Sequence, residues 1–227
     1  MTRFLVLSWP LRADAPVWPG NPPAADLELT DSIARGHGSN ATVLRLFSHS
    51  GTHVDTPWHF NPDGPAGWQL PIETYVFDSP VLVEVPKPEG GFIRREDLGP
   101  HGDAIRHADL LLVRTGWSEH RSTDGERYVE RGPLLHPDAA RWLIDEHSPL
   151  RGIAVDAVSI GSPVDRDASA ETHRILTGVG RNDGRFVLIY EDVRIPVEAA
   201  SATRVYAWPL MVAGADGSPV TMVAEVP

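Results

Sequence analysis

Apolar residues alternate with polar ones in two early segments and form uninterrupted runs in several later ones. The alternation predicts strands at 26–30 and 42–47. Short apolar runs are typical of strands buried on both faces, and the chain has three of them, at 81–85, 110–114 and 151–156. Three more strands are expected towards the C-terminus, at 185–190, 205–208 and 220–226.

Helical periodicity is clearest in residues 136–146. Pro137 falls in the first turn, where its missing N–H costs nothing. Ala140, Leu143 and Ile144 form one apolar stripe along the predicted helix. The segment therefore predicts an amphipathic helix.

Two further helices are expected, a short one at 94–98 and another at 170–177. Ser169 is suited to cap the second, and Gly178 and Gly180 would end it. The 21 prolines and 20 glycines indicate a turn-rich chain. Because strands outnumber helices and no regular βαβ rhythm is visible, we expect a mixed α/β fold in a single domain over residues 1–227.

Composition narrows the function classes. A chain of 227 residues suits one large domain, and its formal net charge of −11 argues against nucleic-acid binding. The chain has no stretch of about 18 apolar residues, so no membrane span is predicted. The first apolar run is too short for a secretory signal. Cysteine is absent, which suits a cytoplasmic protein and excludes disulfides and thiolate metal sites.

The segment His49-Ser-Gly-Thr-His-Val-Asp-Thr-Pro-Trp-His59 places three histidines and a carboxylate within eleven residues. Imidazole and carboxylate groups are ligands of Zn²⁺ and Mn²⁺. Pro57 and Gly51 disfavour a helix here. A turn at Gly51 followed by extended chain would put His53 and Asp55 on the same side, as a metal site requires. The alternative is a histidine-rich surface turn without metal.

His59 follows Pro57 and is suited to proton transfer, because the usual pKa of histidine lies close to neutral pH. The chain has ten histidines in all. Those scattered away from the cluster are expected on the surface: His37, His101, His107, His120 and His147.

The pattern H-x-G-T-H-x-D-x-P-x-H in residues 49–59 resembles the signature of the metal-dependent cyclase family, which includes bacterial kynurenine formamidases and isatin hydrolases. Three other segments resemble motifs of that family: Pro16-Val-Trp-Pro-Gly20, Arg114-Thr-Gly-Trp117 and Val155-Asp-Ala-Val-Ser159. The resemblance covers most of the chain, and it implies a single mixed domain of the swivelling β/β/α type.

The resemblance also implies roles for the clustered residues. His49, His53 and Asp55 correspond to ligands of a first metal, and Asp55 is a candidate bridge to a second. His59 corresponds to the residue that takes and gives the proton. The implied cofactor is Zn²⁺ or Mn²⁺, one or two ions per chain.

Three more site residues follow from the resemblance: His173 and Glu191 as the remaining ligands, and Trp18 as a wall of the substrate pocket. Each has an alternative. His173 could face water, Glu191 could lie at a solvated strand end beside Arg194, and Trp18 could serve packing alone.

Two departures from the family pattern affect the substrate. The spacing between His173 and Glu191 is longer than in the formamidases, and the surplus, 179–184, is expected to be a loop that alters a pocket wall or a subunit contact. Trp58 is bulky for its place in the signature, so it either narrows the pocket or packs in the core.

The chain lacks a G-x-S-x-G elbow as well as cysteine, so no side chain is placed for covalent acyl chemistry. The expected reaction is attack of metal-activated hydroxide on an amide or cyclic amide carbonyl of an aryl small molecule. A cyclase or dehydratase with the same metal site is the first alternative, and a metal-binding protein without turnover is the second. The resemblance further implies a homodimer or homotetramer.

Overall fold

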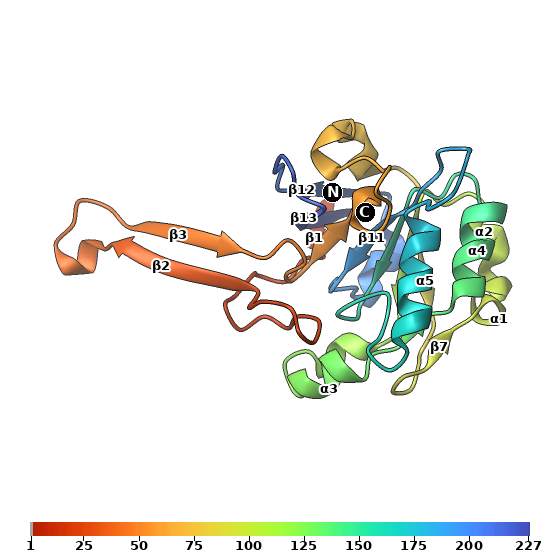
Figure 1. The fold of residues 1–227 in the computed structure, drawn as a ribbon, viewed down its shortest axis with the longest axis horizontal. Helices are drawn as coiled ribbons and strands as arrows, with labels where there is room; N and C mark the ends of the chain where they lie inside the picture. The colour runs from red at the N-terminus through yellow and green to blue at the C-terminus, as the bar shows by residue number, and fades with distance from the viewer. Residues whose placement is uncertain (1) are drawn as a thin grey trace.

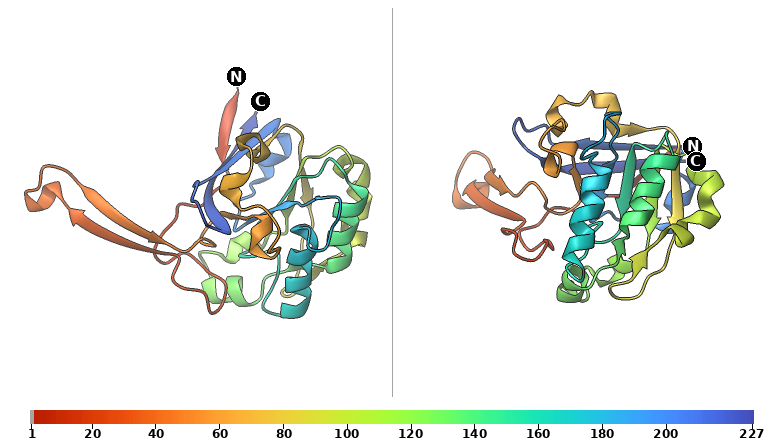
Figure 2. Two further views of the ribbon diagram at one scale, coloured as in Figure 1. Left: turned by 45° about the horizontal axis from the view of Figure 1, so that its top comes forward. Right: turned by 45° about the vertical axis from the view of Figure 1, so that its right-hand side comes forward.

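The computed structural model describes residues 2–227. Most strands join one mixed sheet (Figure 1). In spatial order they are β5 (Val76–Phe77), β12 (Arg204–Pro209), β13 (Gly217–Val226), β4 (His53–Asp55), β11 (Leu188–Glu191), β10 (Gly152–Val155), β8 (Leu110–Arg114) and β6 (Pro80–Glu84). The N-terminal strand β1 (Arg3–Val6) pairs with β13, which brings the two ends of the chain together (Figure 2).

The sheet curls until its edges nearly meet. Its outermost strands, β5 and β6, are separated in the chain only by Asp78 and Ser79. The backbone N–H groups of these two residues donate hydrogen bonds to the carboxylate of Asp109, at 2.8 and 2.9 Å. This carboxylate therefore fixes the turn that joins one edge of the sheet to the other.

Four of the nine strands in this sheet, β6, β8, β10 and β11, run parallel to one another. The connections between these strands contain five α-helices: α1 (Arg95–Leu98), α2 (Gly102–Ile105), α3 (Gly125–Glu130), α4 (Pro137–Glu146) and α5 (Arg166–Leu176). In Figure 1, α4 and α5 lie side by side over one face. A βαβ arrangement is thus present, contrary to expectation. The sequence did not indicate it because helices α1 and α2 have only four residues each, too few for a recognisable helical periodicity.

Two apolar cores lie on opposite faces of the parallel strands. Along β8, Leu111 and Val113 pack towards the helices, whereas Leu110 and Leu112 pack inside the curl of the sheet. The alternation follows from the two-residue period of a strand. Both faces are buried, as the uninterrupted apolar run predicts.

A long two-stranded arm projects from the body (Figures 1 and 2). It consists of β2 (Ala25–Asp31) and β3 (Ala41–Leu46), and its tip carries a 3₁₀ turn (Ile33–Arg35). Leu27 lies opposite Leu44 on one face, and Asp26 lies opposite Arg45 on the other. The arm is therefore amphipathic, and both leucines are exposed. A separate small pair joins β7 (Phe92–Ile93) to β9 (Leu134–Leu135).

Most predicted elements are confirmed to within a few residues. The strands expected at 26–30, 42–47, 81–85, 110–114, 151–156, 205–208 and 220–226 are β2, β3, β6, β8, β10, β12 and β13, and the helices expected at 94–98 and 136–146 are α1 and α4. Among residues 2–227, the structure contains no helix long and apolar enough to cross a membrane.

Two boundaries were wrong. Helix α5 begins at Arg166 and not at Ala170, because Asp165 caps it by accepting a hydrogen bond from the Ala168 N–H at 3.0 Å. Ser169 lies inside the helix, where its hydroxyl donates to the Asp165 carbonyl. The strand expected at 185–190 begins only at Leu188.

Two side chains were also placed wrongly. His147 is buried rather than on the surface, and its ring packs edge-on against Trp142 at 4.3 Å between centroids. Trp58 neither packs in the core nor lines the central cavity, since its side chain is exposed.

Candidate metal centre

The centre is built on β4, the three-residue strand between β11 and β13. Gly51 turns the chain with a φ of +58°, a conformation that glycine adopts readily. The extended strand then points His53 and Asp55 to the same side, as expected from the sequence. Cross-strand pairing places Glu191 of β11 directly opposite His53.

Asp55 faces four histidines. Its Oδ1 lies 2.7 Å from Nδ1 of His49 and 3.5 Å from Nε2 of His53. Its Oδ2 lies 3.6 Å from Nε2 of His173 and 3.8 Å from Nε2 of His59. Because Asp55 is only 1% exposed, its negative charge is available to these groups and hardly screened by water.

Glu191 closes the other side of the cluster. Its Oε2 lies 3.3 Å from Nε2 of His53, and its Oε1 lies 3.3 Å from Nε2 of His173. The Ser159 hydroxyl and the Ile160 N–H both donate to Oε1 at 2.7 Å. Glu191 is therefore buried in the cluster, and the alternative of a solvated strand end is excluded.

Two groups of three residues could each hold a metal ion: His49, Asp55 and His59, and His53, Asp55 and Glu191. Asp55 belongs to both. His173 is buried beside them on α5 and does not face water. The structure thus brings together all six residues predicted for the centre, and Asp55 is the one that both groups share.

The donor set fits a cation. Nε2 of His53 is buried and has no hydrogen-bond partner within residues 2–227, although it faces Asp55 and Glu191. A buried nitrogen of this kind is costly unless something occupies its lone pair or its proton. A divalent ion held by imidazole and carboxylate groups would supply that partner.

The charges in the site support the same conclusion. Burial opposes protonation of His49, but the charge of Asp55 and the hydrogen bond with Asp216 outweigh it and raise the pKa of His49 to about 9. Burial and the charge of Asp55 act to raise the pKa of Glu191, yet hydrogen bonds with His173 and His53 lower it to about 2. The site therefore keeps its carboxylates ionised, and a divalent cation would replace imidazole protons there.

The chain just beyond Glu191 is held by a buried ion pair. Asp192 has a positive φ of 49° and accepts two hydrogen bonds from the Arg121 guanidinium, at 2.7 and 2.6 Å. The Tyr128 hydroxyl donates to the same carboxylate at 2.7 Å. The hydroxyl of Thr52, next to His53, donates to the Asp192 carbonyl at 2.6 Å. These contacts tie the ends of β4 and β11 together.

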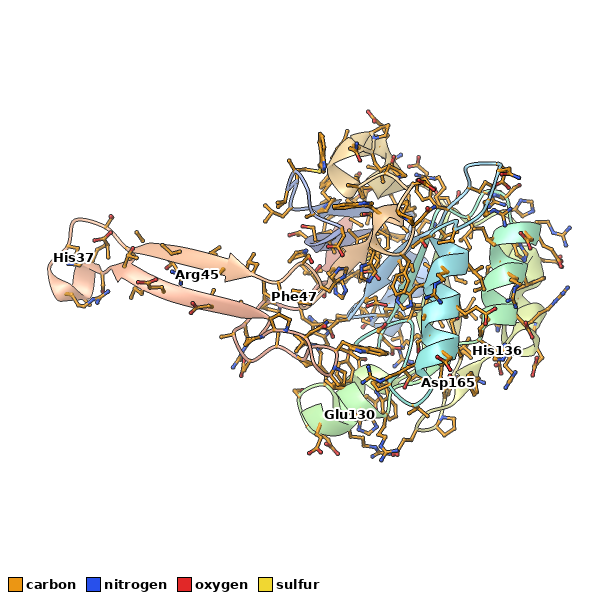
Figure 3. The ribbon with its side chains drawn as sticks, viewed as in Figure 1. His37, Arg45, Phe47, Glu130, His136 and Asp165 are labelled. Atoms are coloured by element: carbon orange, nitrogen blue, oxygen red, sulfur yellow. The ribbon has the colours of Figure 1, made fainter. Side chains whose placement is uncertain are left out.

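A cavity of about 270 Å³ opens over the cluster. Trp18 lines it, as the resemblance implied, together with Phe47 and Phe60. Figure 3 shows Phe47 where the arm meets the body. None of the residues 179–184 lines the cavity, so the expectation that this loop alters a pocket wall is not supported. Arg181 in that loop instead pairs with Asp145 of α4 at 2.6 Å.

Sequence reasoning missed Asp216, which lies between β12 and β13 and reaches the cluster from the far end of the chain. Its carboxylate lies 2.9 Å from Nε2 of His49 and 2.8 Å from Nδ1 of His59. An Asp-Gly pair between two predicted strands is typical of an ordinary turn. No local pattern separates Asp216 from such a turn residue.

The fold is a curled mixed α/β sheet, and a buried cluster of histidines and carboxylates lies in it under an aromatic cavity. These features define the class: a protein that can bind a metal beside a small molecule. The chain belongs to the cyclase family: the family profile described as "Putative cyclase" matches residues 5–162, more than half of the chain. The resemblance stated from the residue 49–59 signature is thereby confirmed.

Relatives and solved structures agree with this assignment. The chain is 30% identical over 223 residues to a kynurenine formamidase of Bacillus cereus, covering 98% of this chain and 97% of that protein. Its fold is similar to that of isatin hydrolase A from Labrenzia aggregata bound to benzyl benzoate, with a TM-score of 0.83 at 21% identity over 99% and 94% of the two chains. A potential metal-dependent hydrolase with cyclase activity matches with a TM-score of 0.75 at 22% identity, over 100% and 99% of the chains.

Proposed function

We propose that this protein is a metal-dependent hydrolase that opens an amide or cyclic amide carbonyl of an aryl small molecule. The observation that carries the proposal is the convergence of His49, His53, Asp55, His173 and Glu191 under an aromatic cavity, with His59 beside them. The 30% identity to a kynurenine formamidase over nearly the whole chain supports an amide as the bond that is broken.

The five residues of that cluster would hold one or two ions of Zn²⁺ or Mn²⁺, and Asp55 would be available to either ion. When bound, such an ion polarises a carbonyl and makes water more acidic. The chain contributes the fixed negative charge of Asp55 and Glu191, and a cavity that holds the substrate over it.

His59 is the proposed proton shuttle. Its side chain is 24% exposed and lines the cavity, whereas Asp55 beneath it is 1% exposed. From this position His59 would take a proton from the attacking water and pass it to the leaving nitrogen. Asp55 stabilises the imidazolium formed between the two transfers, because its Oδ2 lies 3.8 Å from Nε2.

The walls of the cavity favour a planar ring. Trp18, Phe47 and Phe60 supply aromatic faces. The Phe60 ring is stacked on His173, with 4.7 Å between the centroids. Aromatic side chains of this kind bury flat apolar ligands well.

An activity screen with and without chelator tests the proposal. N-formylkynurenine and isatin are the first substrates, followed by a panel of aryl amides, lactams and esters. We expect turnover that chelator abolishes and Zn²⁺ or Mn²⁺ restores.

A cyclase or dehydratase is the second candidate, favoured by the similarity to a structure described as having cyclase activity. Conversion of a linear carbonyl compound without any amide hydrolysis would support that candidate, and metal binding without turnover would support a binding protein.

We also propose that residues 1–227 form one domain and that the protein is a homodimer or homotetramer. The arm supports self-association. A two-stranded hairpin alone in water is only marginally stable, and packing against a second subunit would bury the exposed face that carries Leu27 and Leu44. Light scattering should give an oligomer for the wild type and a smaller species for Leu27→Ser/Leu44→Ser. Arg45→Ala, on the opposite face, is the control. A monomeric wild type would contradict the proposal.

A further inference from the structure

One carboxylate oxygen of Asp216 contacts two histidines of the centre. Its Oδ2 lies 2.9 Å from Nε2 of His49 and 2.8 Å from Nδ1 of His59. The two imidazole rings lie next to each other, with 4.0 Å between their centroids. Asp216 is therefore placed to accept a hydrogen bond from each ring.

An ionised carboxylate can only accept, so the ring nitrogen that faces it must carry the proton. An aspartate carboxylate is ionised at neutral pH, and one oxygen of Asp216 lies within hydrogen-bond distance of both rings. The proton of His49 then lies on Nε2 and that of His59 on Nδ1. In a neutral imidazole the other nitrogen is left with its lone pair.

The other nitrogen of each ring points into the centre, and it would carry the lone pair once a cation replaces the proton that His49 shares with Asp55. Nδ1 of His49 lies 2.7 Å from Oδ1 of Asp55, on the side where a shared cation would bind. Nε2 of His59 points towards the other Asp55 oxygen, Oδ2, at 3.8 Å. One acceptor thus selects opposite tautomers in two neighbouring histidines.

The other two histidines are oriented by the backbone. Nδ1 of His53 lies 2.8 Å from the Gly51 carbonyl, and Nδ1 of His173 lies 2.7 Å from the Ser169 carbonyl. In both cases Nε2 is left facing the carboxylates. These two rings therefore do not depend on Asp216 and provide internal controls.

The position of Asp216 is itself fixed by the strand register. Its backbone carbonyl accepts from the Thr56 hydroxyl at 2.7 Å and from the Thr56 N–H at 3.2 Å. The Ser48 hydroxyl donates to its other carboxylate oxygen, Oδ1, at 3.1 Å. The next residue, Gly217, starts β13 and pairs with Asp55 of β4. The carboxylate is thus anchored to the same strand that carries the ligands.

We propose that Asp216 is the positioning residue of this centre: by accepting hydrogen bonds from Nε2–H of His49 and Nδ1–H of His59, it leaves Nδ1 of His49 to bind the cation and Nε2 of His59 to take the proton. The proposal rests on the proposed function. A carboxylate that accepts from the far nitrogen of a metal-binding histidine fixes its tautomer, and loss of such a partner typically costs 10- to 100-fold in affinity or activity.

The test compares the wild type with Asp216→Ala and Asp216→Asn in the zinc-loaded protein. Three quantities are measured: the tautomer of each histidine by ¹⁵N NMR of the imidazole rings, the zinc dissociation constant by chelator competition, and kcat and KM on whichever substrate the screen yields. Asp63→Asn, an exposed carboxylate outside the cavity lining, is the matched control.

We expect Asp216→Ala to lose the Nδ1–H form of His59, to weaken zinc binding by about 10- to 100-fold and to lower kcat more than it raises KM. Asp216→Asn keeps an acceptor oxygen without the charge, so its zinc affinity and kcat should lie between those of the wild type and of Asp216→Ala. This variant also replaces the alanine variant in the test if Asp216→Ala does not fold. His53 and His173 should keep Nδ1–H throughout.

Unchanged tautomers and unchanged zinc affinity in both variants would overturn the role of Asp216 while leaving the hydrolase proposal intact. Failure of the wild type to bind zinc would instead overturn the proposed function. The tautomer of His59 in that protein would still report on Asp216 alone, so the two failures are distinguishable.

Discussion

Replacing Gly217 by alanine should weaken metal binding although no metal ligand is itself substituted. Gly217 lies against the imidazole of His49, and a Cβ at this position would lie 2.7 Å from Cε1 and 3.1 Å from Nδ1 of that ring. It would also lie 2.8 Å from the carbonyl oxygen of Val54. Carbon atoms pack best at about 3.5–4.0 Å, so the ring must retreat by roughly 0.8 Å.

A displacement of that size exceeds what a metal ligand tolerates, since bond lengths in metal sites hold to within about 0.2 Å. Misplacing one ligand of the centre should cost affinity on the scale seen when a ligand loses its orienting partner, roughly 10- to 100-fold. That loss corresponds to about 1.4–2.8 kcal/mol. The expected result for Gly217→Ala is a zinc dissociation constant raised by this factor.

The assay is zinc competition against a fluorescent chelator, with thermal melting to show that the variant is folded. Gly99→Ala is the matched control, because Gly99 has a helical φ of −53° and open space where its Cβ would lie. A folded Gly217→Ala variant with wild-type zinc affinity would refute the argument, since the ring of His49 would then have room that the structure denies it.

Three further predictions follow from the same centre. Asp55→Ala should lose all bound metal by elemental analysis, because both candidate groups contain Asp55, and metal retained by this variant would count against a shared carboxylate. His173→Ala should retain one ion, because His173 contacts Asp55 and Glu191 but belongs to neither group. His59→Ala should keep its metal content and lose roughly 10²- to 10⁴-fold in kcat, and substantial metal loss would make His59 a ligand instead. Arg121→Met should lower the free energy of unfolding by about 3–5 kcal/mol in a urea titration, since it strands the buried charge of Asp192; a change below about 1 kcal/mol would mean that the pair contributes only as a surface pair does.

The sequence was most informative where the chemistry is local. His49, His53, Asp55 and His59 lie within eleven residues, so their spacing and the intervening Gly51 are enough to predict a turn and a shared face. Short apolar runs such as 110–114 predicted buried strands because both faces of the sheet are covered.

What could not be predicted depends on register between distant strands. Asp216 reaches His59 only because Gly217 pairs with Asp55, a contact across more than 160 residues that no local pattern encodes. His147 was misplaced for a similar reason, since its burial depends on packing against Trp142. The placement of His173 and Glu191 depended on resemblance to a family, because their own surroundings left alternatives open.

The strand β4 has a consequence for how the molecule is held together. It is antiparallel to both of its neighbours, and it is the seam at which the parallel strands, ending with β11, join the antiparallel strands, beginning with β13. The ligands on β4 and β11 lie on both sides of this seam, with Asp216 beside it. An ion bound there would act as a cross-link between segments far apart in the chain, and at a concentration 100 times its dissociation constant it would add about 2.7 kcal/mol to the stability of the folded state. Strand β4 pairs with strands that lie far from it in the sequence, so forming these pairs costs chain entropy, and a bound ion would stabilise only the form in which they are made.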